Sequence, residues 1–200
     1  MTDFGMGSTP VREAVLELLA RGVLVQESHH SVRVAELDLP RLRNIYRVRC
    51  LLEVEAAKLG TAKLSGPDLA AMRVQVRRME GAKRAGDPAE AARADLEFRR
   101  IMYAAADNPI LLDLIDQVWL SFPGSILFAI PGRLARSIKE HHEIMDALAA
   151  RDPTAAGFRV QKNVLGALEV LEVHVKRFTE RPSSNVPPSR RAVTPGSSKH

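Results

Sequence analysis

The 200-residue sequence is poor in aromatic residues, contains one cysteine and has no long apolar run. Aromatic residues make up 4% of the chain, so a core must be built mainly from Leu, Val, Ile and Ala. A lone Cys50 excludes an intramolecular disulfide framework and a multi-cysteine zinc site. There is no stretch of about 18 apolar residues to span a membrane, and no secretory signal pattern. These absences predict a cytoplasmic protein with no membrane partner.

The net charge of +5 is concentrated in one segment. Residues 181–200 contain four basic residues and no acidic ones, together with four prolines and five serines. This composition predicts a disordered basic tail. Because the other 180 residues carry a net charge of only +1, the basic character of the chain does not by itself indicate nucleic-acid binding.

The remaining sequence predicts a mainly α fold. A helix is expected over residues 9–21, followed by two β-prone runs at 23–25 and 32–34. Hydrophobic periodicity, capping residues and prolines then predict six longer helices, at about 38–60, 65–83, 87–106, 109–121, 133–150 and 153–178. Asp87-Pro88-Ala89-Glu90 has the residues of a capping box. Short connections between the helices are typical of an antiparallel bundle.

Polar side chains interrupt the expected apolar faces of four of these helices. Arg49 interrupts the face made by Leu42, Ile45, Leu52 and Ala56, and Asp95, His141 and Asn163 interrupt three others. Arg99 lies one turn after Asp95, and Glu53 one turn after Arg49. Each pair alone is explained by an ordinary contact between residues four apart. Since buried charge is costly unless it is paired, the set also suggests a polar cavity for a small molecule or a metal.

Several motifs resemble the GntR family of transcriptional regulators. Thr9-Pro10-Val11-Arg12-Glu13-Ala14 is similar to the signature of the recognition helix, and residues 22–34 fit the wing hairpin that follows it. Further landmarks resemble the FCD ligand-binding domain of the FadR subfamily: Arg49-Cys50-Leu51-Leu52-Glu53, Asp95-Leu96-Glu97-Phe98, Asn108, Glu140-His141 and Arg151-Asp152. The resemblance covers about residues 4 to 178.

The resemblance implies a homodimeric DNA-binding regulator with three segments. Residues 1–36 would form an incomplete winged helix-turn-helix domain, with one recognition helix and the wing. Residues 37–180 would form an all-α effector-binding and dimerisation domain, and residues 181–200 the tail. DNA contacts are assigned to Ser8, Thr9 and Arg12 near the start of the recognition helix and to His30 in the wing, because helix N-termini and arginine suit phosphates and guanine edges.

The DNA-binding segment departs from the family pattern. The family has further helical elements before the position of Met1, and these bury the apolar face of the recognition helix. Ser8 stands where the family usually has Arg, and Glu27 and Ser31 replace the usual Arg and Gly of the wing. Residues 1–36 hold three arginines and five acidic residues. Because DNA affinity depends on neutralising phosphates, we expect weak or absent DNA binding.

The effector site departs as well. Many FCD domains hold a divalent metal with one Asp and three His, and the matching positions here are Asp95, Arg99, His141 and Asn163. Only Asp95 and His141 are metal ligands, and a guanidinium cannot coordinate a cation. We therefore expect no metal cofactor. The predicted ligand is a small organic acid attracted by Arg49 and Arg99, with His141 and Asn163 orienting it.

Two other functions remain open from the sequence. The chain is alternatively a stand-alone small-molecule-binding and dimerisation module that no longer contacts DNA. A metal-dependent helical-bundle enzyme is a third reading, although no phosphate loop, HExxH or GxSxG motif is present. The expectation is that the protein is not an enzyme.

Overall fold

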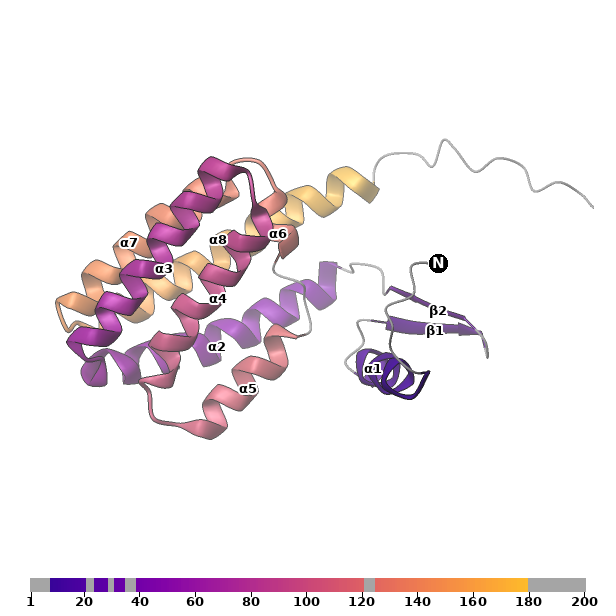
Figure 1. The fold of residues 1–200 in the computed structure, drawn as a ribbon, viewed down its shortest axis with the longest axis horizontal. Coiled ribbons are helices and arrows are strands. Elements are labelled where there is room, and N and C mark those ends of the chain that lie inside the picture. Colours follow the sequence, from indigo (N-terminus) through magenta and orange to yellow (C-terminus); the bar gives the residue numbers. More distant parts are fainter. Residues whose placement is uncertain (1–7, 21–23, 29–30, 35–38, 121–124, 180–200) are drawn as a thin grey trace, which may run out of the picture.

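The computed structural model describes residues 8–20, 24–28, 31–34, 39–120 and 125–179, and these are mainly helical (Figure 1). The N-terminal elements are α1 (Ser8–Ala20), β1 (Leu24–Ser28) and β2 (Ser31–Val34). The bundle comprises α2 (Leu39–Lys63), α3 (Gly66–Ala85), α4 (Pro88–Ala104), α5 (Pro109–Trp119), α6 (Ser125–Ala129), α7 (Arg133–Ala149) and α8 (Pro153–Thr179). The predicted fold class is confirmed. None of the described helices is both long and apolar enough to cross a bilayer.

Local capping signals set where the bundle helices begin. Ser65 caps α3 in a reciprocal capping box with Asp68, and Asn108 caps α5 through a bond from the backbone N–H of residue 111. Asp87 caps α4 by accepting from the backbone N–H of Glu90. The return bond from the Glu90 carboxylate to the backbone N–H of Asp87, expected for a capping box, is not formed, because this carboxylate pairs with Arg78 and Arg93 instead.

Two details differ from the sequence-based expectation. The short helix α6 lies between Pro123-Gly124 and Pro131-Gly132, in a stretch where the sequence predicted no helix. Strand β1 extends to Ser28 and β2 begins at Ser31, so the hairpin is longer than the β-prone runs indicate. The strands pair antiparallel from Leu24 opposite Val34 to Ser28 opposite Ser31, with an irregularity after position 26. Backbone pairing therefore continues into polar residues that have little strand propensity.

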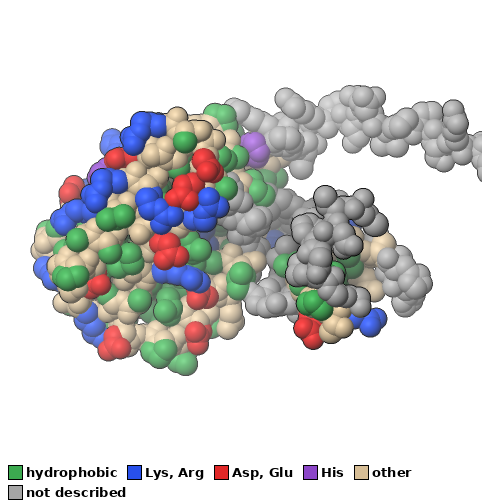
Figure 2. Space-filling model, viewed as in Figure 1, with side chains coloured by type: hydrophobic (Ala, Val, Ile, Leu, Met, Phe, Trp, Pro, Cys, Tyr) green, Lys and Arg blue, Asp and Glu red, His purple; other side chains and the backbone are tan. Residues whose placement is uncertain are grey.

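The bundle is organised around α8, which packs along α2 on one side and α7 on the other (Figure 1). Helices α3 and α4 form an antiparallel pair, and α3 also packs against α7. The core is built mainly from aliphatic residues, methionine and alanine, as the composition predicts. On the visible surface, basic and acidic side chains are interleaved rather than separated into areas of one sign (Figure 2).

The buried face of α2 differs from the predicted one. Ile45 and Leu52 are only partly buried, whereas Tyr46 and Glu53, one position further along, are fully buried. The rotation of about 100° per residue carries these two positions to the side that meets α4 and α8. As a result Glu53, a carboxylate, lies in the centre of the bundle.

The N-terminal elements bury much less. Figure 1 shows α1 beside its hairpin, at the end of the bundle where α2 starts. Val11, Leu16 and Leu18 of α1 are 47%, 58% and 38% exposed. Among the described residues, α1 packs mainly against β1.

Candidate functional site

The Glu53 carboxylate is the centre of a hydrogen-bonded cluster inside the bundle. Its Oε1 accepts from Arg49 Nε at 2.6 Å and from Trp119 Nε1 at 2.9 Å. Its Oε2 accepts from Arg99 Nη1 at 3.0 Å and from Tyr103 Oη at 2.8 Å. Helices α2, α4 and α5 thus direct four donors at one carboxylate. This arrangement has the charge and shape of a carboxylate-binding site, and the chain's own Glu53 occupies it.

Arg99 connects this cluster to the other predicted site residues. Its Nε donates to Asp95 Oδ2 at 2.9 Å, and its Nη2 donates to Asn163 Oδ1 at 2.5 Å. With the bond to Glu53, the guanidinium contacts side chains from α2, α4 and α8. Because Arg99 bears one charge and faces two carboxylates, the interior retains negative charge that a second cation must balance. Arg49 supplies that charge.

His141 lies beside Asp95 on the opposite side from Arg99. Its Nε2 is 2.8 Å from Asp95 Oδ1, although neither atom has the alignment of a regular hydrogen bond. Its Nδ1 is 2.7 Å from the backbone oxygen of Ser137, which fixes the ring orientation. The ring also stacks at a tilt against Phe98, with centroids 4.4 Å apart. The imidazole is fully buried.

Asn163 joins the cluster to a second group of charges near α7. Its Nδ2 donates to Glu140 Oε2 at 2.7 Å, and the same oxygen accepts from Arg133 Nη1 at 2.8 Å. Glu140 Oε1 accepts from Arg136 Nε at 2.8 Å. Arg133 is buried, and its Nε has no hydrogen-bond partner. The polar interior therefore continues from α2 through α8 to α7.

The ion pairs determine the charge states of the buried groups. Burial alone would raise the pKa of Glu53, but Arg49 and Arg99 more than offset this, and the pKa is lowered. Burial would also raise the pKa of Asp95, but the neighbouring Arg99 and His141 outweigh burial, and the pKa of Asp95 is strongly lowered. The pKa of Tyr103 is raised well above its usual value by burial and by the neighbouring Glu53. Both carboxylates are therefore ionised at neutral pH, and the tyrosine is a hydrogen-bond donor.

The structure brings four of the five predicted effector-site residues into direct contact. Asp95, Arg99, His141 and Asn163 form a continuous set, and Arg49 joins it through Glu53. The pairs Arg49–Glu53 and Asp95–Arg99 are also the ordinary contacts between residues four apart that the sequence left as an alternative. They differ from surface pairs in being buried.

The predicted DNA-contacting residues are placed only in part. Ser8 is the first residue of α1, and Thr9 and Arg12 are exposed in its first two turns. His30 lies outside the described residues. The exposed positions at the N-terminus of α1 are compatible with contact to a phosphate or a base edge.

The residues in the bundle do not fit a metal ion. Asp95 is bound by Arg99, whose guanidinium takes the place of a ligand and repels cations. Asn163 has its oxygen on Arg99 and its nitrogen on Glu140. Within the described segments, no group of three or more His, Cys, Asp or Glu side chains has the arrangement to hold a metal.

Sequence reasoning missed several members of the cluster. No site role was predicted for Tyr103 or Trp119 from the sequence, and Glu140 was named only as a family landmark beside His141. Tyr103 is four residues after Arg99, so the same helical face was available as a signal. Trp119 comes from a different helix, and only the tertiary structure shows that its ring nitrogen reaches Glu53.

The matches to known proteins agree with this architecture. The FCD domain model matches residues 44–162, which is more than half of the chain. The chain is an FCD-domain member of the GntR family of transcriptional regulators. It is 30% identical over 154 residues to the HTH-type transcriptional regulator McbR of Escherichia coli K12, covering 75% of this chain and 70% of that protein. It is 30% identical over 169 residues to a probable D-xylose utilization operon transcriptional repressor of Paenarthrobacter nicotinovorans, covering 83% and 74%.

Solved structures of this family share the fold. The E. coli McbR/YncC structure has a TM-score of 0.75 and 26% identity, covering 84% of this chain and 87% of that one. A GntR regulator from Rhodococcus sp. RHA1 has a TM-score of 0.65 at 20% identity, with coverages of 84% and 82%. The family comprises transcriptional regulators rather than enzymes, as the sequence predicts.

Proposed function

We propose that this FCD-domain regulator is a cytoplasmic homodimer that contacts operator DNA through α1 and the wing and binds a small organic acid within its helical bundle. Residues 1–36 would form the DNA-binding segment, 37–180 the effector domain and 181–200 a tail. The four-donor carboxylate cluster around Glu53 is the observation that supports the effector class. The family relationship supports the role of α1, in which Thr9 and Arg12 are exposed.

The buried polar atoms indicate how an acid would be accommodated. Arg133 Nε is buried without a hydrogen-bond partner, and Asp95 Oδ1 and His141 Nε2 contact only each other, at 2.8 Å. An unsatisfied buried donor costs about 1–3 kcal/mol, so a ligand or water that reaches Arg133 Nε is favoured. An acid that exchanges with Glu53 or Asp95 on Arg99 would gain a charged partner and release the displaced carboxylate. Such an exchange would give the ligand-free and ligand-bound domains different internal pairing.

Thermal unfolding with a panel of small organic acids tests the effector proposal. A ligand present at 100 times its dissociation constant stabilises the folded state by about 2.7 kcal/mol. In Glu53→Ala, we expect formate or acetate to raise the melting temperature, because Arg49, Arg99, Tyr103 and Trp119 lose their carboxylate. The exposed Glu55→Ala is the matched control and should show no such rescue. If no acid shifts the melting temperature of the wild type and neither ion rescues Glu53→Ala, the effector class is wrong.

We further propose that the 200-residue protein binds DNA weakly. The segment 1–36 has a net charge of −2, and phosphate neutralisation supplies most non-specific affinity. At physiological ionic strength we expect a dissociation constant for sheared duplex DNA weaker than the roughly 10⁻⁴–10⁻⁶ M that is typical of non-specific binding. Fluorescence anisotropy measures this directly, with Arg12→Glu as the variant at the proposed contact. Submicromolar binding by the wild type contradicts the proposal.

The acidic N-terminal segment favours one alternative function. Val11 and Leu16 of α1 are about half exposed, and the segment 1–36 that contains this helix has a net charge of −2, which is unfavourable for phosphate contact. A chain with such an N-terminal segment would act as a small-molecule-binding and dimerisation module without DNA. Acid-induced stabilisation combined with no DNA binding at any salt concentration would support the module over the regulator.

A further inference from the structure

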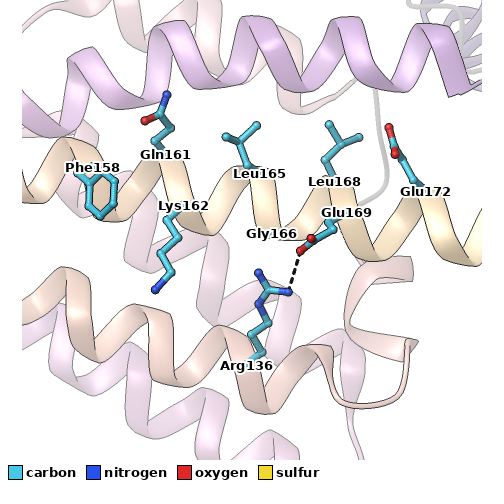
Figure 3. A pocket seen from close by; sticks show the side chains of 9 residues that line it. All are labelled: Arg136, Phe158, Gln161, Lys162, Leu165, Gly166, Leu168, Glu169 and Glu172. Atoms are coloured by element: carbon cyan, nitrogen blue, oxygen red, sulfur yellow. Dashed lines mark hydrogen bonds and ion pairs between the residues drawn. The ribbon is translucent and has the colours of Figure 1, made fainter.

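The outer face of α8 forms an open groove that the effector cluster does not use. The groove has a volume of about 460 Å³ and is lined by α8 residues together with Arg136 of α7 (Figure 3). Phe158 and Leu165 are 59% and 43% exposed there, and Val173 follows on the same helix at 49%. Exposed apolar residues in a row are typical of an interaction surface.

Two opposite charges flank the centre of this row. Lys162 and Glu169 lie three and four residues on either side of Leu165, and Figure 3 shows both pointing toward α7. Their side chains are 48% and 70% exposed. Among the described residues, Lys162 Nζ lies 3.5 Å from Glu143 Oε2 and Glu169 Oε2 lies 3.1 Å from Arg136 Nη1, and both ion pairs are partly exposed to solvent. We call Phe158, Lys162, Leu165, Glu169 and Val173 the α8 stripe.

The α8 stripe alternates apolar and charged residues in the same order from either end, and its two charged residues have opposite signs. If two copies of α8 cross antiparallel with a two-fold axis between positions 165 and 166, residue i faces residue 331 − i of the other copy. Lys162 then faces Glu169 of the second copy, and Phe158 faces Val173 of the second copy. An isologous interface requires this kind of self-complementarity. The two-fold axis makes the Lys162–Glu169 ion pair and the Phe158–Val173 contact each form twice.

Helix α2 extends the apolar area. Arg43 Nε pairs with Glu172 at 2.6 Å, and the backbone at Gly157 approaches the side chain of Lys58, so α2 and α8 run antiparallel. This packing places Leu51 of α2 level with the middle of the α8 stripe. Leu51 is 74% exposed, which is unfavourable in an isolated domain but suits a surface that another chain covers.

We propose that the α8 stripe is the surface through which two copies of this chain associate, with the two-fold axis passing beside Leu165. This inference rests on the homodimer in the proposed function and adds the surface and the residue pairing. The occupant is a second copy rather than another partner, because the charges complement themselves when reversed. The wild-type chain should therefore dimerise without any other component.

The first test replaces the residue nearest the axis. Leu165→Glu places two like charges beside each other at the two-fold axis, and we expect dimerisation at least about tenfold weaker in analytical ultracentrifugation. Because Leu165 is partly exposed, the monomer should fold, and circular dichroism and the melting temperature check this. Lys139→Glu, an exposed change of charge elsewhere on α7, is the matched control and should leave the dimer intact.

A charge exchange tests the residue pairing. Lys162→Glu alone and Glu169→Lys alone each create like-charge contacts and should weaken the dimer. An equimolar mixture of the two variants should form heterodimers, because both facing pairs then have opposite charges. The double variant Lys162→Glu/Glu169→Lys should dimerise on its own for the same reason.

The outcomes separate this inference from the proposed homodimer. If the wild type dimerises and Leu165→Glu dimerises equally well, the α8 stripe is wrong and the homodimer stands. If the wild type is monomeric at micromolar concentration, both are overturned. If the single charge variants weaken the dimer but their mixture does not restore it, the pairing of Lys162 with Glu169 is overturned.

Discussion

The interior of the bundle and helix α1 differ in which side chains they bury. The bundle buries charges such as Glu53 and Arg99 and gives each of them several partners. Helix α1 leaves apolar residues such as Leu16 in contact with solvent. The comparison shows that polarity alone does not decide burial in this chain. What decides it is whether the neighbouring helices supply complementary groups.

Removing the central arginine should produce the largest effect. Arg99→Ala leaves Glu53 and Asp95 buried with fewer counter-charges, and we expect the free energy of unfolding to fall by about 3–5 kcal/mol. Urea denaturation measures the change. The neighbouring Arg100→Ala, which removes a half-exposed pair with Asp116, should cost less than about 1 kcal/mol. Equal losses for the two variants would mean that the buried cluster contributes no more than a surface pair.

Matched leucine substitutions compare the two regions directly. Leu148 in α7 is fully buried, so Leu148→Ala should cost about 2–5 kcal/mol through lost burial and the cavity left behind. Leu16 in α1 is 58% exposed, and Leu16→Ala should change stability by no more than about 0.5 kcal/mol. Thermal and urea unfolding of both variants gives the values. A large loss for Leu16→Ala would show that α1 has a partner in solution.

Lowering the pH should have a smaller effect, through the buried carboxylates of Glu53 and Asp95. The pKa values of Glu53 and Asp95 are lowered in the folded state, so their contribution to stability is present above the unfolded pKa values near 4. It is lost as pH falls below that range through the lowered folded values. We expect the free energy of unfolding to decline below about pH 4, and the decline to be shallower in Glu53→Gln. The exposed Glu55→Gln should retain the wild-type profile.

The sequence predicted local features of the fold better than the buried cluster. The starts of α3, α4 and α5 follow from Ser65, Asp87 and Asn108, because a cap acts within one turn of the chain. The short helix α6 was missed, because five residues carry too little periodicity to be recognised. The family motif, rather than composition, indicated the regulator.

The site was predicted in its members but not in its centre. Asp95, His141 and Asn163 each interrupt an apolar face, and Arg99 lies one turn after Asp95, so these signals can be recognised from one helix at a time. The central role of Glu53 depends on Trp119 of α5 and on residues of α4, and no local pattern encodes such contacts. On α2, Leu42 and Ala56 of the expected face are buried, but Tyr46 and Glu53 are buried in place of the more apolar Ile45 and Leu52.

The side-chain amide of Asn163 connects two groups of buried charged residues, one around Glu53 and one around Glu140. It accepts from Arg99 on the Glu53 side and donates to Glu140 on the α7 side, and Glu140 in turn accepts from Arg136, which reaches Glu169 on the outer surface. An amide is the uncharged group that can serve both neighbours at once, whereas an aspartate would repel Glu140. A rotation of this one amide would break a bond in each group. Events at the Arg99 guanidinium and at the α8 surface are thus connected by four consecutive polar contacts.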